Sequence, residues 1–133
     1  KIDPATGHVL ASIPAPGDGG DSGLDWAEGT LGLGQYRHRE IHLIDPESGA
    51  ILRTIDCDRF VTGVTWVDGE LWHGTWENDQ CDVRRIDPVS GVALETLQMP
   101  AGTVVSGLES DGGDRFFCGG GGSGKITAIR RRR

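Results

Sequence analysis

The sequence predicts an all-β repeat fold, and three observations carry that prediction. The pattern I-D-P-x-[ST]-G occurs three times, beginning at Ile2, Ile44 and Ile86, so its copies stand 42 residues apart. Short stretches of alternating apolar and polar residues, typical of half-buried strands, follow the copies. No long stretch shows helical periodicity. A fixed period of this length indicates that each unit buries its apolar face against its neighbours.

Each copy of the pattern is predicted to be a tight turn. Pro46 presets φ at about −65° behind Asp45, whose side chain can cap the turn. Glycine then supplies a position with positive φ. We therefore expect positive φ at Gly49 and Gly91, and a chain reversal at every copy.

The strands of one repeat are predicted in a constant order. An outer strand follows each turn, over residues 9–13, 51–55 and 93–97. An inner strand comes next and opens with a hydroxyl residue and a glycine, at Ser22-Gly23, Thr62-Gly63 and Ser106-Gly107. A tight hairpin at 28–29, 68–69 or 111–113 leads to a strand over 31–34, 71–74 or 116–119. The last strand covers 41–44, 83–86 or 126–129.

Four antiparallel strands in 42 residues match one blade of a β-propeller. A β-sandwich also has short strands and tight turns, but it would not produce this self-similarity. The chain is thus predicted to hold three four-stranded blades of a ring of about five to seven. Residues 1–14 would be the outer strand of a preceding or closing blade, 15–56 and 57–98 two complete blades, and 99–133 a blade lacking its own outer strand.

Three blades alone leave open sheet edges. The chain is therefore expected either to be the C-terminal portion of a longer propeller or to self-associate, two copies making six blades. The start at Lys1 rather than at methionine favours the first alternative. Both alternatives stay open at this point.

The composition argues against two classes of partner, nucleic acid and membrane. A formal net charge of −7 argues against nucleic acid, and the chain has no apolar run long enough to span a membrane. Cys57, Cys81 and Cys118 are odd in number and form no C-x-x-C pair, so we expect free thiols in a reducing compartment, which favours the cytoplasm. The arginines at 130–133 are expected to form a solvated terminus or a frayed strand rather than a phosphate-binding tail.

One segment carries a family resemblance. The string W-V-D-G-E-L-W at 66–72, followed by I-D-P-V-S-G at 86–91, resembles the blade pattern of the glutamine cyclotransferases, the plant and bacterial glutaminyl cyclases. It is also similar to the gluconolactonase/regucalcin and YVTN-type propellers. The resemblance covers nearly the whole chain as a blade pattern, and it specifies the fold more strongly than the chemistry.

The resemblance also implies where chemistry would lie. Gluconolactonase-like propellers begin an inner strand with a metal-binding glutamate, and the matching positions here carry hydroxyl residues, which removes the charged oxygen that such an ion prefers. We therefore predict no cofactor, and a divalent cation only with ligands from outside this segment. Acidic loop residues are expected to be solvated; they are Asp18, Asp21, Asp56 and Asp58.

The cyclotransferase inner strand carries glutamates of an N-E-L-E motif for proton transfer on the glutamine amine and amide. Gly63 and Thr65 stand at those places in the second repeat, whereas Asp25 in the first and Glu109 in the third keep a carboxylate. The catalytic blade is thus expected either to lie outside this segment or never to have existed.

Two further patterns have plainer interpretations. Residues 119–125 match G-x-x-x-x-G-K, but Ile126 stands where a phosphate-binding loop needs Ser or Thr, and a strand follows in place of a helix, so we interpret this segment as a loop. His73 belongs to no metal or nucleophile motif. We predict a packed or channel-lining histidine over a catalytic one.

Long connections are predicted on one face of the blades, at 14–21, 35–40, 56–61, 76–82, 98–105 and 119–124. Long loops can shape a site, whereas two-residue turns only close strands. The first hypothesis is a module that binds a small molecule or peptide at this face. The alternative is the C-terminal part of a cyclotransferase-like or lactonase-like enzyme. The candidate binding residues are Trp76, Arg59, Tyr36, Arg37, His73, Asp58, Glu77, Asp79, Ser22, Thr62, Ser106 and Glu109.

Overall fold

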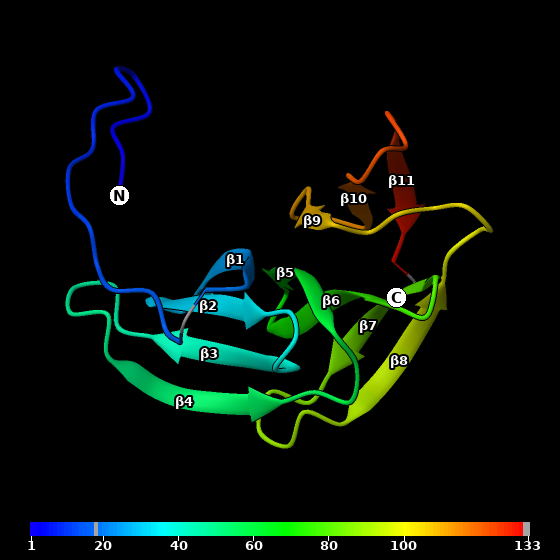
Figure 1. Cartoon of the computed structure of the whole chain (residues 1–133), viewed down its shortest axis with the longest axis horizontal. Coiled ribbons are helices and arrows are strands. Elements are labelled where there is room, and N and C mark those ends of the chain that lie inside the picture. Colours follow the sequence, from blue (N-terminus) through cyan, green and yellow to red (C-terminus); the bar gives the residue numbers. More distant parts are fainter. Residues whose placement is uncertain (18, 132–133) are drawn as a thin grey trace.

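The computed structural model describes residues 1–17 and 19–131, and it confirms the all-β class. The described residues form three antiparallel sheets (Figure 1). Blade 1 comprises β1 (Asp21–Ala27), β2 (Thr30–Gln35), β3 (Glu40–Ile44) and β4 (Ile51–Asp56). Blade 2 comprises β5 (Val61–Val67), β6 (Glu70–Glu77), β7 (Gln80–Ile86) and β8 (Ala93–Gln98). Blade 3 comprises β9 (Gly107–Ser110), β10 (Arg115–Gly119) and β11 (Ile126–Arg130).

Each blade is a meander in which strands adjacent in sequence pair with one another. The inner strands β1, β5 and β9 gather near the centre of the molecule, and the outer strands β4 and β8 lie at its periphery (Figure 1). This arrangement is that of a partial β-propeller. The part of the chain that the structure describes contains no helix long and apolar enough to cross a membrane.

The repeated turns have the predicted geometry. The φ angles of Gly49 and Gly91 are 76° and 75°, in the region that favours glycine. Asp45 Oδ1 accepts a hydrogen bond from the Glu47 amide, and Asp87 Oδ1 accepts one from Val89. The aspartate and the glycine of the pattern therefore act together to reverse the chain.

The hydroxyl–glycine motif has a packing explanation. A Cβ atom on Gly23 would overlap the amide nitrogen of Val64, and one on Gly63 would overlap that of Leu108. Each pair places the start of one inner strand against the inner strand of the next blade. Glycine is required there because the backbones of neighbouring blades touch.

Two apolar clusters join the blades. One lies between blades 1 and 2 and includes Ile41, Ile55, Val64 and Leu71; the other lies between blades 2 and 3 and includes Trp72, Val83, Val105 and Phe116. In the second cluster the rings of Trp72 and Phe116 stand 5.0 Å apart between centroids. The core therefore sits between blades, as a propeller requires.

The two end faces of the array are uncovered. Leu24 is 59% exposed, whereas Val64, at the matching position of blade 2, is 1% exposed. At the other end Ile126 is 81% exposed, whereas the matching Ile41 is fully buried. A groove of about 620 Å³ runs along the free face of blade 1, between that face and residues 11–16. Both end faces thus have the apolar character of the internal interfaces.

Two expectations about the chain ends need correction. Residues 9–13 form no strand; Val9 makes only an isolated bridge to Ile2, because the described residues give this segment no neighbouring strand to pair with. Arg131 is buried rather than solvated, and its guanidinium pairs with Asp68 and Glu70 of blade 2. Asp18, Arg132 and Arg133 lie outside the described residues.

Candidate functional site

The predicted loop at 76–82 is a tight hairpin. Strand β6 continues to Glu77 and β7 begins at Gln80, with a two-residue turn at Asn78 and Asp79 whose φ angles are 54° and 59°. Positive φ at both central residues suits the twist of a two-residue hairpin, and Asn and Asp tolerate it. Of the predicted binding residues in this segment, Trp76 and Glu77 therefore lie on a strand, and Asp79 lies in the turn.

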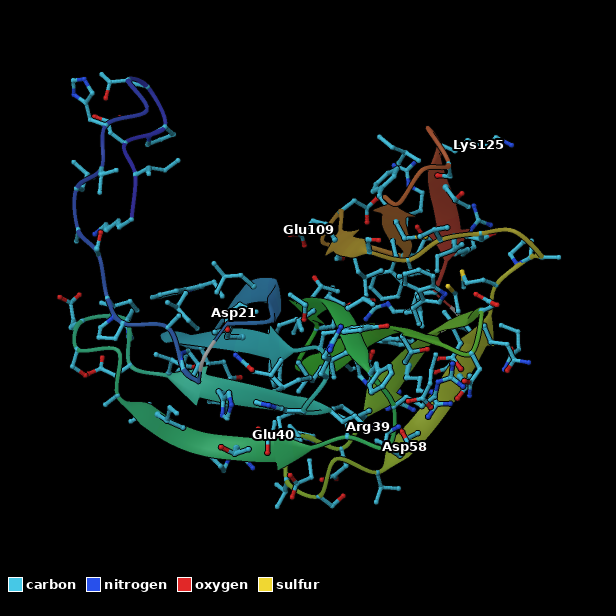
Figure 2. The ribbon with its side chains drawn as sticks, in the orientation of Figure 1. Asp21, Arg39, Glu40, Asp58, Glu109 and Lys125 are labelled. Carbon is cyan, nitrogen blue, oxygen red and sulfur yellow. The ribbon has the colours of Figure 1, made fainter. Side chains whose placement is uncertain are left out.

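Several predicted binding residues instead join blades 1 and 2. The Tyr36 hydroxyl donates a hydrogen bond of 2.9 Å to the carbonyl oxygen of Trp76. Arg39 forms an ion pair with Glu77, at 2.7 Å between Nη2 and Oε1, and its guanidinium lies over the Phe60 ring. Figure 2 shows Arg39 and Asp58 where the loops of these two blades meet. These contacts hold the blades together.

Arg59 and Asp58 are engaged as well. Arg59 Nη2 donates to the carbonyl oxygens of Glu77 and Gln80, at 3.3 and 3.0 Å, and so braces the hairpin between β6 and β7. Both oxygens of Asp58 accept hydrogen bonds from Arg84 Nη1, at 2.7 and 2.8 Å. The groups chosen for their charge thus already have partners inside the protein.

Exposed candidates remain at the same face. Trp76 is 41% exposed, and Arg37 and Asp79 are exposed too. His73, by contrast, is fully buried between the blades, with Nδ1 at 2.9 Å from the Gly74 carbonyl oxygen. Burial lowers the pKa of His73, so that the ring is neutral at pH 7. A buried, neutral ring of this kind can pack but cannot meet a ligand directly.

The three hydroxyls at the starts of the inner strands lie in unlike surroundings. Ser22 Oγ donates to the Val61 carbonyl oxygen at 2.8 Å, which links blade 1 to blade 2. Thr62 is buried, and its Oγ1 has no hydrogen-bond partner among the described residues. Ser106 is exposed. They do not form one ring of equivalent ligands.

A more coherent group lies three residues farther along the inner strands, at Asp25, Thr65 and Glu109. Thr65 Oγ1 donates to Glu109 Oε1 at 2.9 Å, across the interface between β5 and β9. The Ser110 amide donates to the same oxygen at 2.7 Å. Figure 2 shows Glu109 on β9, on the side of blade 3 that faces the other blades.

Asp25 differs from Glu109 in its surroundings. Burial raises the pKa of Asp25 to about 6, and the charge of Glu109 contributes to the increase, whereas hydrogen bonds from the backbone of Trp26 and Trp66 oppose it. Asp25 Oδ2 is buried and has no hydrogen-bond partner among the described residues. Glu109 is exposed and has two donors.

Two carboxyl groups in unlike environments can serve as proton donor and proton acceptor near neutral pH. The sequence-based binding set includes Glu109 but omits Asp25. The match in repeat position between Asp25 and Glu109 is visible in the sequence, whereas the burial that raises the pKa of Asp25 is not. No cluster of three or more His, Cys, Asp or Glu side chains suited to a metal ion is found within residues 1–17 and 19–131.

Comparisons with known proteins bear on the fold. The structure is similar to the glutaminyl cyclase of Myxococcus xanthus, with a TM-score of 0.68 and 17% identity, over 85% of this chain and 56% of that chain. It is also similar to a chain of the mitotic checkpoint complex, with a TM-score of 0.57 and 16% identity, over 83% of this chain and 35% of that chain. The computationally designed Ika4 protein gives a TM-score of 0.50 and 12% identity, over 94% and 100% of the two chains.

At these identities the likeness shows the fold alone. The chain spans 56% of the length of the cyclase that it matches. No family model matches the sequence, and no curated protein matches it.

Proposed function

We propose that this chain is part of a β-propeller enzyme that acts on a small molecule or peptide end bearing an amine and an amide, in the manner of a glutaminyl cyclase. The observation that carries the proposal is the pair of unlike carboxyl groups on the inner strands. Asp25 has a pKa of about 6 and an unpartnered buried oxygen, and Glu109 is an exposed carboxylate near enough to raise that pKa.

The chemistry of glutamine cyclisation uses two such groups. The α-amine nitrogen attacks the side-chain amide carbon, a new C–N bond forms, and the amide nitrogen leaves as ammonia. One group must accept a proton from the attacking amine, and one must deliver a proton to the leaving nitrogen. Glu109 suits the first role because it is an exposed carboxylate. Asp25 suits the second because it retains its proton to a pH of about 6.

Binding without chemistry at the loop face has weaker support. Four of the candidates at that face already form hydrogen bonds or ion pairs with other residues of the protein; they are Tyr36, Arg59, Asp58 and Glu77. A ligand that used them would have to break these interactions, at the cost of contacts between blades 1 and 2. Trp76, exposed at this face, remains the best candidate for a subsidiary contact.

The test is turnover of a glutamine-initiated dipeptide amide by the intact protein, with ammonia and pyroglutamyl product measured. Removing one proton-transfer group should lower the rate by about 10²–10⁴-fold, so Asp25→Asn and Glu109→Gln should each show a loss of this order. Glu47→Gln, in the exposed turn between β3 and β4, is the matched control and should keep full activity. No turnover by the wild-type protein, or equal rates in all variants, would contradict the proposal.

A further inference from the structure

We infer that Thr65 is a positioning residue: its hydroxyl fixes the Glu109 carboxylate so that Oε2 is presented to a ligand N–H group, which selects a primary ammonium. This inference deepens the proposed function and depends on it for the identity of the site. Thr65 lies outside the pair of carboxyl groups, Asp25 and Glu109, to which the proposed reaction assigns proton transfer.

The contact geometry supports the role. Thr65 is fully buried on β5, whereas Glu109 lies exposed on β9. An exposed glutamate has several rotamers, and a hydrogen bond to a buried, immobile hydroxyl selects among them. The 2.9 Å bond from Thr65 Oγ1 is therefore an anchor that joins a mobile side chain to a rigid strand.

The two donors reach the same carboxylate oxygen. Thr65 Oγ1 and the Ser110 amide both donate to Oε1 of Glu109. Among the interactions of the described residues, Oε2 is thus the oxygen left to accept a hydrogen bond from a ligand. An ammonium group supplies both the charge and the N–H donor for a charge-assisted bond, whereas a quaternary ammonium supplies the charge alone.

The repeat explains why position 65 carries threonine. In blade 1 the matching Asp25 accepts a hydrogen bond from the backbone of Trp66, on the inner strand of blade 2. In blade 2 Thr65 donates a hydrogen bond to Glu109, on the inner strand of blade 3. A third carboxylate at position 65 would add like charge beside Asp25 and Glu109, which is unfavourable. A neutral donor there both avoids that repulsion and holds Glu109.

The experiment measures binding of two probes to the intact protein at pH 7 by calorimetry: glutaminamide, and its N,N,N-trimethyl analogue. Thr65→Val keeps the volume and removes the hydroxyl, and it should weaken glutaminamide binding about tenfold, which is about 1.4 kcal/mol. Thr65→Ser restores the hydroxyl and should bind within about twofold of wild type. Wild-type protein should bind the trimethyl analogue about tenfold more weakly than glutaminamide, and Thr65→Val should bind both alike.

Several outcomes would overturn the inference. Wild-type binding of the two probes with equal affinity would remove the role of the N–H donor, and unchanged binding in Thr65→Val would remove the role of the hydroxyl. If Thr65→Val does not fold, Thr65→Ala takes its place, and the same loss with rescue by serine is expected. If the probes bind as expected but the protein does not turn over its substrate, the proposed reaction is wrong and the role of Thr65 stands. If the protein turns over its substrate but Thr65→Val binds glutaminamide as tightly as wild type, the role of Thr65 is wrong and the proposed reaction stands.

Discussion

Gly63 on β5 lies so close to Leu108 on β9 that a Cβ atom on Gly63 would overlap the Leu108 amide nitrogen. Replacing Gly63 with alanine should therefore push blade 3 away from blade 2 and lower the free energy of unfolding by about 1–3 kcal/mol, as overpacking of a tight contact does. Urea denaturation of the variant measures the change.

The third repeat supplies the matched control. Gly107 stands at the same motif position, but a Cβ atom there would meet nothing within 4 Å. Gly107→Ala should change the free energy of unfolding by less than about 1 kcal/mol, with stabilisation expected because alanine restricts the unfolded chain. Equal destabilisation by Gly63→Ala and Gly107→Ala would mean that the inner strands do not pack as described.

Arg59 is expected to matter for stability. Its guanidinium donates to the carbonyl oxygens of Glu77 and Gln80, and hydrogen bonds from a charged group contribute about 1.5–3 kcal/mol. Arg59→Ala should therefore lower the free energy of unfolding by about that amount, whereas Arg37→Ala, at an exposed position of the neighbouring loop, should leave it nearly unchanged. Thermal unfolding measures the melting temperatures of the two variants. Similar melting temperatures would contradict a stabilising role for the hydrogen bonds of Arg59.

The raised pKa of Asp25 predicts a stability that depends on pH. The ordinary value is 3.8 and the folded value about 6, so between these values the folded protein holds more protons than the unfolded protein. Stability from this group is fully present below pH 3.8 and is lost as the pH rises through about 6. Asparagine is neutral at every pH and avoids the loss. Asp25→Asn should thus gain stability over wild type at pH 7.5 but much less at pH 4.

Urea midpoints of Asp25→Asn and wild type at the two pH values give the comparison. Asp79→Asn, in an exposed turn that tolerates asparagine, controls for the general effect of removing a charge, and its difference from wild type should be alike at both values. A gain for Asp25→Asn that is larger at pH 4 would have the wrong sign for a carboxyl held protonated by the fold.

The fold could be predicted because its determinants are local and repeated. Gly49 and Gly91 specify turns through their own φ angles, and the 42-residue period transfers each assignment to the next blade. The strand at 9–13 was not realised because pairing depends on a neighbour, which the alternation pattern cannot supply. The hairpin at Asn78 and Asp79 replaces the loop predicted at 76–82, because Asn and Asp supply the positive φ that a tight turn needs without a glycine.

The site was less predictable because it depends on contacts between blades. Arg59 and Glu77 carry charges that could bind a ligand. Only the structure shows that Arg59 bonds to the Glu77 carbonyl oxygen and that the Glu77 carboxylate pairs with Arg39. The sequence shows that Asp25 keeps a carboxylate at the repeat position of Glu109, but it does not show the surroundings of that carboxylate. Its raised pKa comes from burial and from Glu109, which lies two repeats away in sequence, and neither is visible in the residues around it.

The central claim is that the inner strands bring Asp25 and Glu109 together as unequal carboxyl groups. The most direct measurement is the titration of the Asp25 carboxyl carbon by NMR in wild type and in Glu109→Gln. The account predicts a midpoint near pH 6 in wild type and a lower one in Glu109→Gln, because the neighbouring charge is removed. A wild-type midpoint near the ordinary 3.8, unchanged by Glu109→Gln, would contradict it.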